Sequence, residues 1–347
     1  MTTRYLTKPV STLRKSFTMD DMKGTTGIVP EDKCANTHAT GDKIESVELR
    51  LNEDDVNGRS VELTSKKDSY VLMRDCNAST RLTAQHYLWK DLLGYLIHPD
   101  IPTGFDDLKI ADVATGNGIW LHDVSRSKST SAELHGFDIS LDQVGPKAWL
   151  PANIRMHIWN IFDEPPPQFI GYFDIVHVRL ITVVVKNNDP QPVLANLAKL
   201  LKPGGYLQWD EVDTISSSIK TVPGVSGSSL NKLYSQLKGN NTRDDTWVTL
   251  IEKSRVHTTD CHFSWKYRLT EILDENGFTG SLLYTYEYGH GLARLWNDIY
   301  VSTWKEFANN VLKTPRMSED LERKGMEEAR NGAAIMTPKL VWVTRKE

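Results

Sequence analysis

The sequence predicts an α/β fold organised around a mainly parallel β-sheet. Short apolar runs alternate with helical patterns from Leu108 onward, as in chains that build parallel sheets. The first run ends in a glycine-containing turn at 114–118, and a helical pattern follows it. The chain has 347 residues, of which 39% are hydrophobic and 25% charged, which is an ordinary composition for a globular protein.

The charge balance and the cysteines narrow the class of protein. With 41 Lys and Arg against 45 Asp and Glu, the formal net charge is −4, which argues against nucleic acid as a partner. No apolar run reaches the roughly 18 residues that a membrane-spanning helix needs. Cys34, Cys76 and Cys261 are too widely spaced to form a disulfide framework, and the N-terminus has no apolar signal segment. We therefore expect a cytoplasmic protein with no membrane partner.

Two segments precede the sheet. Residues 1–68 are polar and poor in aromatic residues, and we expect a mobile N-terminal arm there. In 69–104, Leu82, His86, Trp89 and Leu93 recur at helical spacing. We expect an N-terminal helical lid that ends at His98–Pro99, where the proline stops the helix.

The core over 105–214 contains five expected strands and one well-marked helix. The helix is closed by a Lys-Pro-Gly-Gly turn, because proline ends the helix and glycine permits the tight turn that follows. The strands are Leu108–Val113, Glu133–Phe137, Ile154–Ile158, Phe173–Val178 and Gly205–Trp209, and the helix is Pro192–Leu201.

The rest of the chain interrupts this core twice. We expect a lid insertion over 215–262, a continuation of the core over 263–290, a helical insertion over 291–337 and a last core strand over 338–347. The continuation holds a helix near 266–276 and a strand at 282–288. Because about fifty residues separate that strand from the last one, the connection is unusually long for two neighbouring strands. It would lie at the carboxyl ends of the strands, where open α/β sheets bind ligands.

The most informative stretch is the turn after the first strand. Small residues at a strand end let a ligand approach the backbone, and the helix that follows favours electron-rich groups. Asp138 comes twenty residues after Gly118, at the end of the second strand, where a carboxylate can accept from both ribose hydroxyls. The third glycine of the dinucleotide pattern is missing, since position 121 is Leu121, and this counts against NAD.

Several ordered motifs give the chain a family resemblance. They are Arg81–His86, Leu96–Pro99, Ile110–Gly116, Trp120–Leu121, Gly136–Ser140, Trp149–Pro151, Tyr172–Arg179 and Leu201–Glu211. With these motifs the chain resembles class I S-adenosylmethionine-dependent methyltransferases, in particular the fungal secondary-metabolism branch called UMTA-type or LaeA-like. The resemblance implies a Rossmann-like, seven-stranded mixed sheet with strand order 3-2-1-4-5-7-6 and helical lid insertions. It also implies S-adenosylmethionine as the cofactor.

The resemblance assigns cofactor-binding roles residue by residue. The turn would hold the methionine part, Asp138 the ribose, and Ile139 the face of the adenine. Asn160 and Ile161 would lie beside the adenine amino group, and Arg179 near the sulfonium or the substrate. Two positions depart from the family pattern, because Ala114 stands where glycine is usual and Asn160 where an acidic residue is usual. The turn residues that carry this role are Asp112, Ala114, Thr115, Gly116 and Gly118.

A methyl group on a sulfonium is already activated, so the protein has to align a nucleophile and exclude water. A general base helps when the nucleophile carries a proton. His86 is the preferred candidate and Glu211 the second, with His177 and His290 as further possibilities. Each also has a simple packing role as its alternative. We expect no metal, because no cluster with ligand spacing lies near the strand ends.

The substrate expectation comes from the aromatic residues of the insertions. Trp247, Tyr286, Tyr288, Trp296, Tyr300 and Trp304 suggest a small aromatic or polyketide-like molecule, although packing within the lid explains the same residues. Two other functions stay open: a cyclase or pericyclase on the methyltransferase fold, and a LaeA-like regulatory protein with protein partners. The sequence leaves the oligomeric state and the methylated atom undetermined.

Overall fold

The computed structural model describes residues 70, 72–104, 107–127, 131–214, 216–229, 263–307, 309 and 315–347. The expected arm over 1–68, most of the insertion over 215–262 and Trp247 lie outside the described residues. Among the described helices, none is long and apolar enough to cross a membrane.

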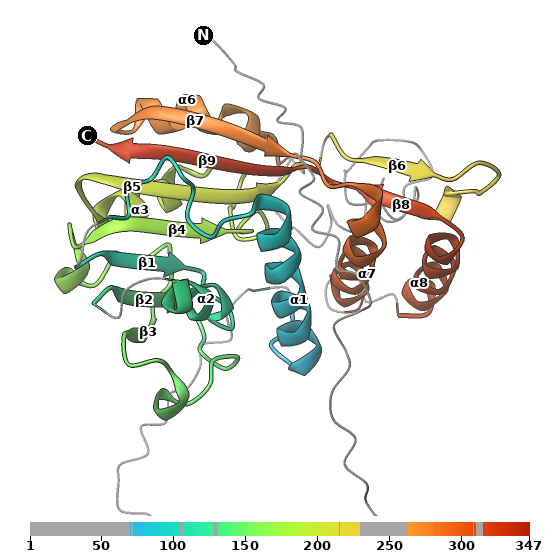
Figure 1. The fold of residues 1–347 in the computed structure, drawn as a ribbon, viewed down its shortest axis with the longest axis horizontal. Coiled ribbons are helices and arrows are strands. Elements are labelled where there is room, and N and C mark those ends of the chain that lie inside the picture. Colours follow the sequence, from blue (N-terminus) through green and yellow to red (C-terminus); the bar gives the residue numbers. More distant parts are fainter. Residues whose placement is uncertain are drawn as a thin grey trace, which may run out of the picture. The chain divides into compact units, whose positions relative to one another are not determined.

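Seven strands form one mixed sheet in the order β3-β2-β1-β4-β5-β9-β7 (Figure 1). Since β7 is the sixth core strand and β9 the seventh, this is the order 3-2-1-4-5-7-6, and the predicted fold class is confirmed. The strands are β1 (Lys109–Val113), β2 (Glu133–Asp138), β3 (Ile154–Ile158), β4 (Phe173–Arg179), β5 (Leu201–Val212), β7 (Phe278–Tyr286) and β9 (Lys339–Lys346).

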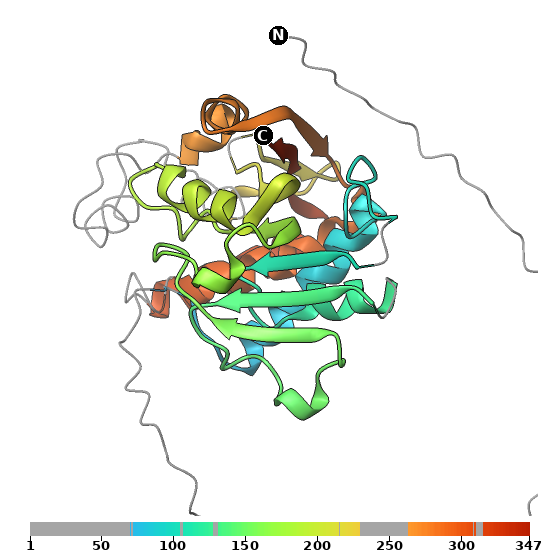
Figure 2. The ribbon, with the colours of Figure 1, turned by 90° about the vertical axis from the view of Figure 1, so that its left-hand side faces the viewer.

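The first five core strands are parallel, and the last one runs against its two neighbours. Strands β1, β2 and β3 point the same way in Figure 2. Strand β9 pairs antiparallel with both β5 and β7, and Lys339 is opposite Val212 and Tyr286. The beginning of β9 therefore lies at the carboxyl edge of the parallel strands, which is the ligand-binding edge of an open α/β sheet.

Alternate side chains of each strand face opposite sides, so the sheet has two apolar cores. One core contains the buried faces of α3 (Gln191–Leu200) and α6 (Leu269–Glu275) against residues such as Val176 and Leu207. The other contains α1 (Cys76–Leu93), α2 (Ile119–Ser127) and α7 (His290–Phe307) against residues such as Ile175 and Val341. Short 3-10 helices span Lys147–Trp149, Pro167–Phe169 and Phe263–Arg268.

Helix α1 has clear signals at both ends. The Asp75 carboxylate accepts from the backbone N–H of Ala78 at 2.8 Å, which caps the first turn and is worth about 1 kcal/mol. The helix ends at Leu93, because Gly94 takes a left-handed φ of 75° and its N–H caps the Lys90 carbonyl. The prediction that the helix reaches His98–Pro99 was wrong, since the glycine ends it five residues before the proline.

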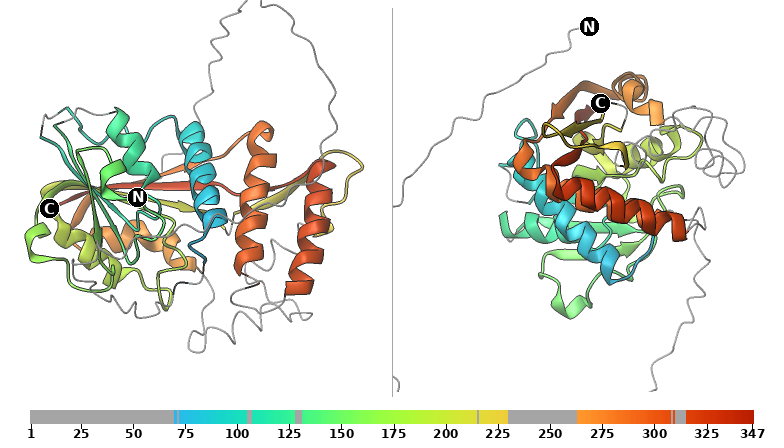
Figure 3. Two further views of the ribbon diagram at one scale, coloured as in Figure 1. Left: turned by 90° about the horizontal axis from the view of Figure 1, so that it is seen from below. Right: turned by 90° about the vertical axis from the view of Figure 1, so that its right-hand side faces the viewer.

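The C-terminal insertion contains helices and a strand. Helices α1, α7 and α8 (Pro315–Arg330) lie side by side (Figure 3). Strand β6 (Ser218–Thr221) pairs antiparallel with β8 (Ala333–Met336) in a separate small sheet. The Asn297 amide of α7 donates to the Ala333 carbonyl and accepts from the Ile335 N–H, so a buried side chain joins the helix to β8. The expectation of helices alone missed this sheet, because four-residue strands carry too little alternation to be recognised.

Candidate functional site

The turn between β1 and α2 is built from left-handed backbone conformations. Ala114, Gly116 and Gly118 have φ values of 57°, 59° and 76°. Glycine adopts this region without strain, whereas alanine does so at a cost of about 1 kcal/mol. A Cβ atom at Gly118 would lie 2.6 Å from Cε of Met156, so a larger residue there would require the flexible end of that side chain to move. Ala114 therefore holds a strained conformation at the strand end where the ligand was predicted.

Asp138 lies at the end of β2 and faces this turn. Its carboxylate accepts from the backbone N–H of Gly116 at 2.9 Å and from that of Ser140 at 3.2 Å. Burial raises the pKa of this carboxyl, while these N–H groups and the charge of Arg74 oppose the rise. The side chain is only partly buried, and the next residue, Ile139, is 38% exposed. A polar acceptor and an accessible apolar side chain are thus adjacent beside the glycine turn.

The residues predicted to lie beside the adenine follow β3. The Asn160 side-chain oxygen accepts from the backbone N–H of Phe162 at 3.2 Å. Ile161 is buried, and its carbonyl accepts from the Asn196 amide at 2.9 Å. Asn160 is therefore held in an Asx turn, and its oxygen keeps one further lone pair for another donor.

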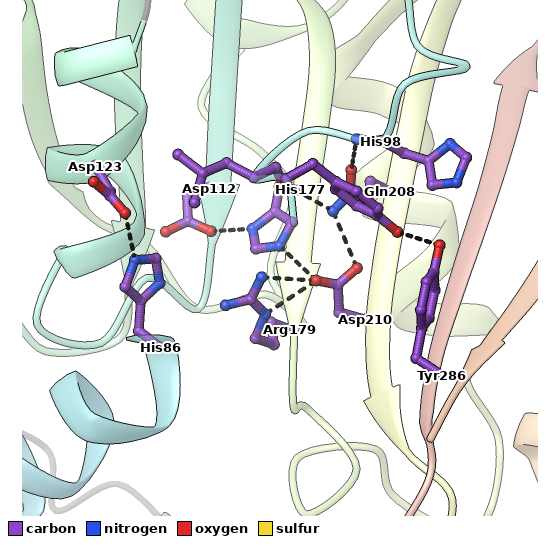
Figure 4. A network of polar contacts seen from close by, with 11 residues as sticks. His86, His98, Asp112, Asp123, His177, Arg179, Gln208, Asp210 and Tyr286 are labelled. Carbon is purple, nitrogen blue, oxygen red and sulfur yellow. Dashed lines mark hydrogen bonds and ion pairs between the residues drawn. The ribbon is translucent and has the colours of Figure 1, made fainter. Parts of the chain in front are cut away.

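A buried chain of charged groups crosses the carboxyl ends of β1, β4 and β5 (Figure 4). Nδ1 of His177 lies 2.7 Å from Oδ1 of Asp112, and its Nε2 lies 3.4 Å from Oδ2 of Asp210. Arg179 donates to the same Asp210 oxygen through Nε at 3.0 Å and Nη2 at 2.8 Å. Thr115 donates from Oγ1 to Asp112 at 2.6 Å, so the chain begins in the glycine turn.

His177 lies between two carboxylates, those of Asp112 and Asp210. Burial lowers its pKa, but the hydrogen bonds and charges of Asp112 and Asp210 outweigh burial, and the net shift is upward. The indole of Trp120 stacks on the imidazole at a centroid distance of 4.0 Å. A cation on an indole face is favourable, so Trp120 adds to the same effect.

Arg179 also lies over the ring of Trp89, with 4.9 Å between Cζ and the ring centroid. On the same side of the sheet, Nζ of Lys339 lies 3.9 Å from the centroid of Trp296 and 5.5 Å from that of Trp89. Nζ donates to the hydroxyl of Tyr300 at 2.6 Å and to the Thr337 carbonyl at 2.8 Å. Burial holds the pKa of Lys339 well below its ordinary value. This aromatic environment joins α1, α7 and β9.

His86 of α1 faces α2. Its Nε2 lies 3.1 Å from Oδ2 of Asp123, and Nζ of Lys90 donates to the same oxygen at 2.7 Å. The imidazole is 3% exposed.

The second base candidate, Glu211, is fully buried on the opposite face of the sheet. It accepts from the Ile181 N–H at 3.0 Å and from the Thr182 hydroxyl at 2.5 Å, so it holds that loop.

The remaining aromatic and histidine residues that were predicted as site residues differ in how exposed they are. His290 begins α7 and is exposed. Tyr286 is half-buried and accepts from the hydroxyl of Tyr95 at 2.8 Å, within electrostatic reach of Asp210. Four of the predicted aromatic residues instead belong to the packing of the insertion, which was the simpler explanation of their pattern. They are Tyr288, Trp296, Tyr300 and Trp304.

Some residues of this region carried no usable sequence signal. Tyr70 is 39% exposed, but its hydroxyl is desolvated, which raises its pKa, and the Asp138 charge adds to that rise. The segment before α1 therefore lies within electrostatic range of the end of β2. Arg74, in the same segment, acts on Asp138 with the opposite sign. Asp123 is distant in sequence from His86, its hydrogen-bond partner, and Lys339 is distant from the aromatic rings that it contacts. The packing of α1 against the sheet brings Tyr70 and Arg74 to the site, and the pairing of β9 with β5 brings Lys339 there.

Comparison with known proteins gives a domain match and partial relatives. Residues 110–205 match a family described as a methyltransferase domain. "Methyltransferase grgD" of Penicillium sp is 33% identical over 152 residues, which are 42% of this chain and 52% of that protein. "N-methyltransferase verN" of Clonostachys rogersoniana is 31% identical over 150 residues, 43% of this chain and 52% of that protein. The matches span about half the length of these curated relatives.

Solved structures were also compared. The [4+2]-cyclase SpnF has a TM-score of 0.44 at 15% identity, covering 75% of this chain and 80% of that chain. Geranyl diphosphate C-methyltransferase from Streptomyces coelicolor A3(2) has a TM-score of 0.40 at 15% identity, covering 76% of this chain and 77% of that chain.

Proposed function

We propose that this protein is an S-adenosylmethionine-dependent methyltransferase that acts on a small molecule. One observation carries the proposal. The partly buried carboxylate of Asp138 lies beside the left-handed glycine turn, at the carboxyl edge of the sheet, within the stretch that matches a methyltransferase domain.

The residues present fit an adenosyl cofactor at this edge. Asp138 is an acceptor beside a backbone cradle, and a Cβ at Gly118 would displace the end of the Met156 side chain. In our proposal, Asp138 holds the ribose hydroxyls, with Ile139 against the adenine face. The free lone pair of Asn160 accepts from the adenine amino group, next to the backbone of Ile161.

The methionine end is assigned to the turn. Asp112 and Thr115 form a 2.6 Å hydrogen bond next to the left-handed residues Ala114 and Gly116. The Asp112 oxygens keep lone pairs for an ammonium donor, and His177 and Thr115 fix their direction. Arg179 is held by Asp210, near the point where the nucleophile would meet the methyl group.

When bound, S-adenosylmethionine supplies a methyl group on a positively charged sulfur. The chain's part is to orient and to exclude water. Helix α1 packs over the turn, where Asn117 donates to the side-chain oxygen of Thr83 at 3.0 Å and to the backbone carbonyl of Ser79 at 3.2 Å. Leu82 lies against Gly116. The helix therefore acts as a lid over the cofactor turn.

We infer a secondary metabolite of aromatic or polyketide-like character as the acceptor. Relatives described as N-methyltransferases occur in fungi, which supports methylation of a nitrogen atom as the first reaction to test. The half-buried pair Tyr95 and Tyr286 offers ring surface and hydroxyl groups near Arg179 and Asp210. Such surfaces favour flat, partly polar molecules.

The test is transfer of a labelled methyl group to candidate metabolites, followed by mass spectrometry. The proposal expects a product that has gained one methyl group and equimolar S-adenosylhomocysteine. The strained Ala114 and the uncharged Asn160 favour, as a second candidate, a cyclase that keeps the fold without methyl transfer. Conversion of a precursor without mass gain and without need for the methyl donor would select the cyclase.

A further inference from the structure

The hydrogen bond between His86 and Asp123 determines which imidazole nitrogen carries the proton. A carboxylate can only accept, so Nε2 of His86 must be the N–H that points at Oδ2 of Asp123, 3.1 Å away (Figure 4). In the neutral ring, Nδ1 then holds a free lone pair.

That lone pair has no partner within the described part of the chain. Nδ1 of His86 is buried and accepts no hydrogen bond there. A buried polar atom without a partner costs roughly 1–3 kcal/mol, so its retention calls for an explanation. The charges that act on the ring come from Asp123 on α2, Asp112 on β1 and Arg179 on β4. His86 therefore lies within electrostatic range of the carboxyl ends of β1 and β4, where the methyl-transfer centre is proposed.

The surroundings keep the imidazole neutral. Lys90 donates to Asp123 at 2.7 Å, and Nη2 of Arg126 lies 3.5 Å from its other oxygen, so the carboxylate is balanced without a charged histidine. Burial, followed by the Arg179 charge, lowers the pKa of His86 to about 4. At neutral pH the ring is available to receive a proton.

We propose that His86 accepts the proton of the nucleophile at Nδ1, and that Asp123 is the positioning residue that fixes its tautomer. The inference rests on the proposed function and narrows the substrate class to nucleophiles that carry their proton, such as N–H or O–H groups. The arrangement matches that of other catalytic histidines, in which a buried carboxylate orients the ring through the opposite nitrogen.

The atoms and electrons of the step balance. The lone pair of the nucleophile forms the bond to the methyl carbon, and the carbon–sulfur bond breaks with its electron pair left on sulfur. The N–H or O–H bond of the nucleophile breaks, and its proton moves to Nδ1 of His86. Since methylation makes that proton more acidic, even a weakly basic imidazole can receive it. The imidazolium later loses the proton to solvent.

The direct test is the protonation state of His86 in the free protein, read by nitrogen NMR of histidine-labelled protein and assigned with His86→Gln. The proposal expects an unprotonated Nδ1 and a protonated Nε2 between pH 6 and 8. Asp123→Ala should produce a mixture of tautomers. The matched control is Asp91→Ala, which removes an exposed carboxylate from α1, the helix that carries His86. It should leave the signals unchanged. A proton on Nδ1 in the unmodified protein would overturn the proposal, whether or not Asp123→Ala folds.

A second test compares acceptors that differ only in their proton. N-methylaniline carries an N–H, whereas N,N-dimethylaniline does not. His86→Gln should slow transfer to the first by about 100-fold or more and leave transfer to the second nearly unchanged. Equal losses with both acceptors would overturn the assignment of His86. Failure of the proposed function is distinguishable, because the unmodified protein would then transfer no methyl group to any acceptor, while the tautomer of His86 could still be read.

Discussion

The indole of Trp120 lies parallel to the imidazole of His177, with 4.0 Å between ring centroids and 4° between ring planes. The two carboxylates that contact the imidazole raise its pKa against the effect of burial. A group whose pKa is raised in the folded state contributes stability below its unfolded value and loses it as pH rises through the folded value. The folded protein therefore gains from protonation of a residue at its centre.

The first prediction concerns pH and His177. Relative to His177→Gln, the unmodified protein should be most stabilised below pH about 6.5, and the difference should shrink as pH rises through the raised pKa of His177. Urea unfolding of both proteins from pH 6 to pH 9 measures the difference in the free energy of unfolding. A difference that does not depend on pH would contradict a charged His177.

His135 should behave in the opposite way. Its Nδ1 lies 3.0 Å from Nε2 of His157, and burial, then the charges of His157 and Arg155, lower its pKa to about 4. A lowered histidine pKa means that stability is lost as pH falls from about 6.5 towards 4, because only the unfolded chain takes up the proton. His135→Phe should reduce this loss by an amount on the order of 3 kcal/mol. Unfolding curves at pH 7 and pH 4.5 test it, and identical losses in both proteins would refute it.

The third prediction separates packing from backbone strain in the glycine turn. Gly118→Ala places a methyl group against Met156 and forces alanine into a left-handed conformation. Gly171 has a similar φ of 64° but open space around it, so Gly171→Ala reports the strain alone, about 1 kcal/mol. Because the end of the Met156 side chain must move, we expect Gly118→Ala to lose slightly more stability than Gly171→Ala and to weaken binding of S-adenosylmethionine, by thermal melting and calorimetry. Equal effects of the two substitutions would exclude a packing requirement at Gly118.

The fourth prediction concerns the lid. Asn117 joins the turn to α1 through Ser79 and Thr83, so Asn117→Ala should speed hydrogen exchange in α1 and dissociation of S-adenosylmethionine. Asn153 makes comparable amide hydrogen bonds to Ser125 and Ala132, away from the lid. Asn153→Ala is therefore the control. If both variants leave exchange in α1 unchanged, Asn117 does not hold the lid.

The sequence predicts those parts of the structure that depend on patterns within one short segment, and it does not predict contacts between segments that are distant in sequence. The strands around Asp112 and Asp138 were predictable, because apolar runs and glycine turns are local patterns. The dyad of His86 and Asp123 was not, since its members come from two helices that meet only after the sheet forms. The same reason hides Lys339, whose aromatic neighbours come from α1, α7 and the segment before α7. Local composition gives no indication of such partners.

The observed end of α1 differs from the predicted end for another reason. Both Gly94 and Pro99 are stop signals, and the prediction chose the later one. The glycine acts first because its left-handed conformation lets its N–H cap the Lys90 carbonyl. Ala114 is similar, since its positive φ becomes visible only when the turn is formed.

The central claim is that Asp138 holds the ribose of S-adenosylmethionine, and calorimetry tests it most directly. The unmodified protein should bind the cofactor, and Asp138→Ala should bind it at least about 10-fold more weakly, because hydrogen bonds to a charged acceptor are worth about 1.5–3 kcal/mol each. Asp142→Ala, which removes an exposed carboxylate nearby, should bind normally. Folded Asp138→Ala protein with unchanged affinity would contradict the account.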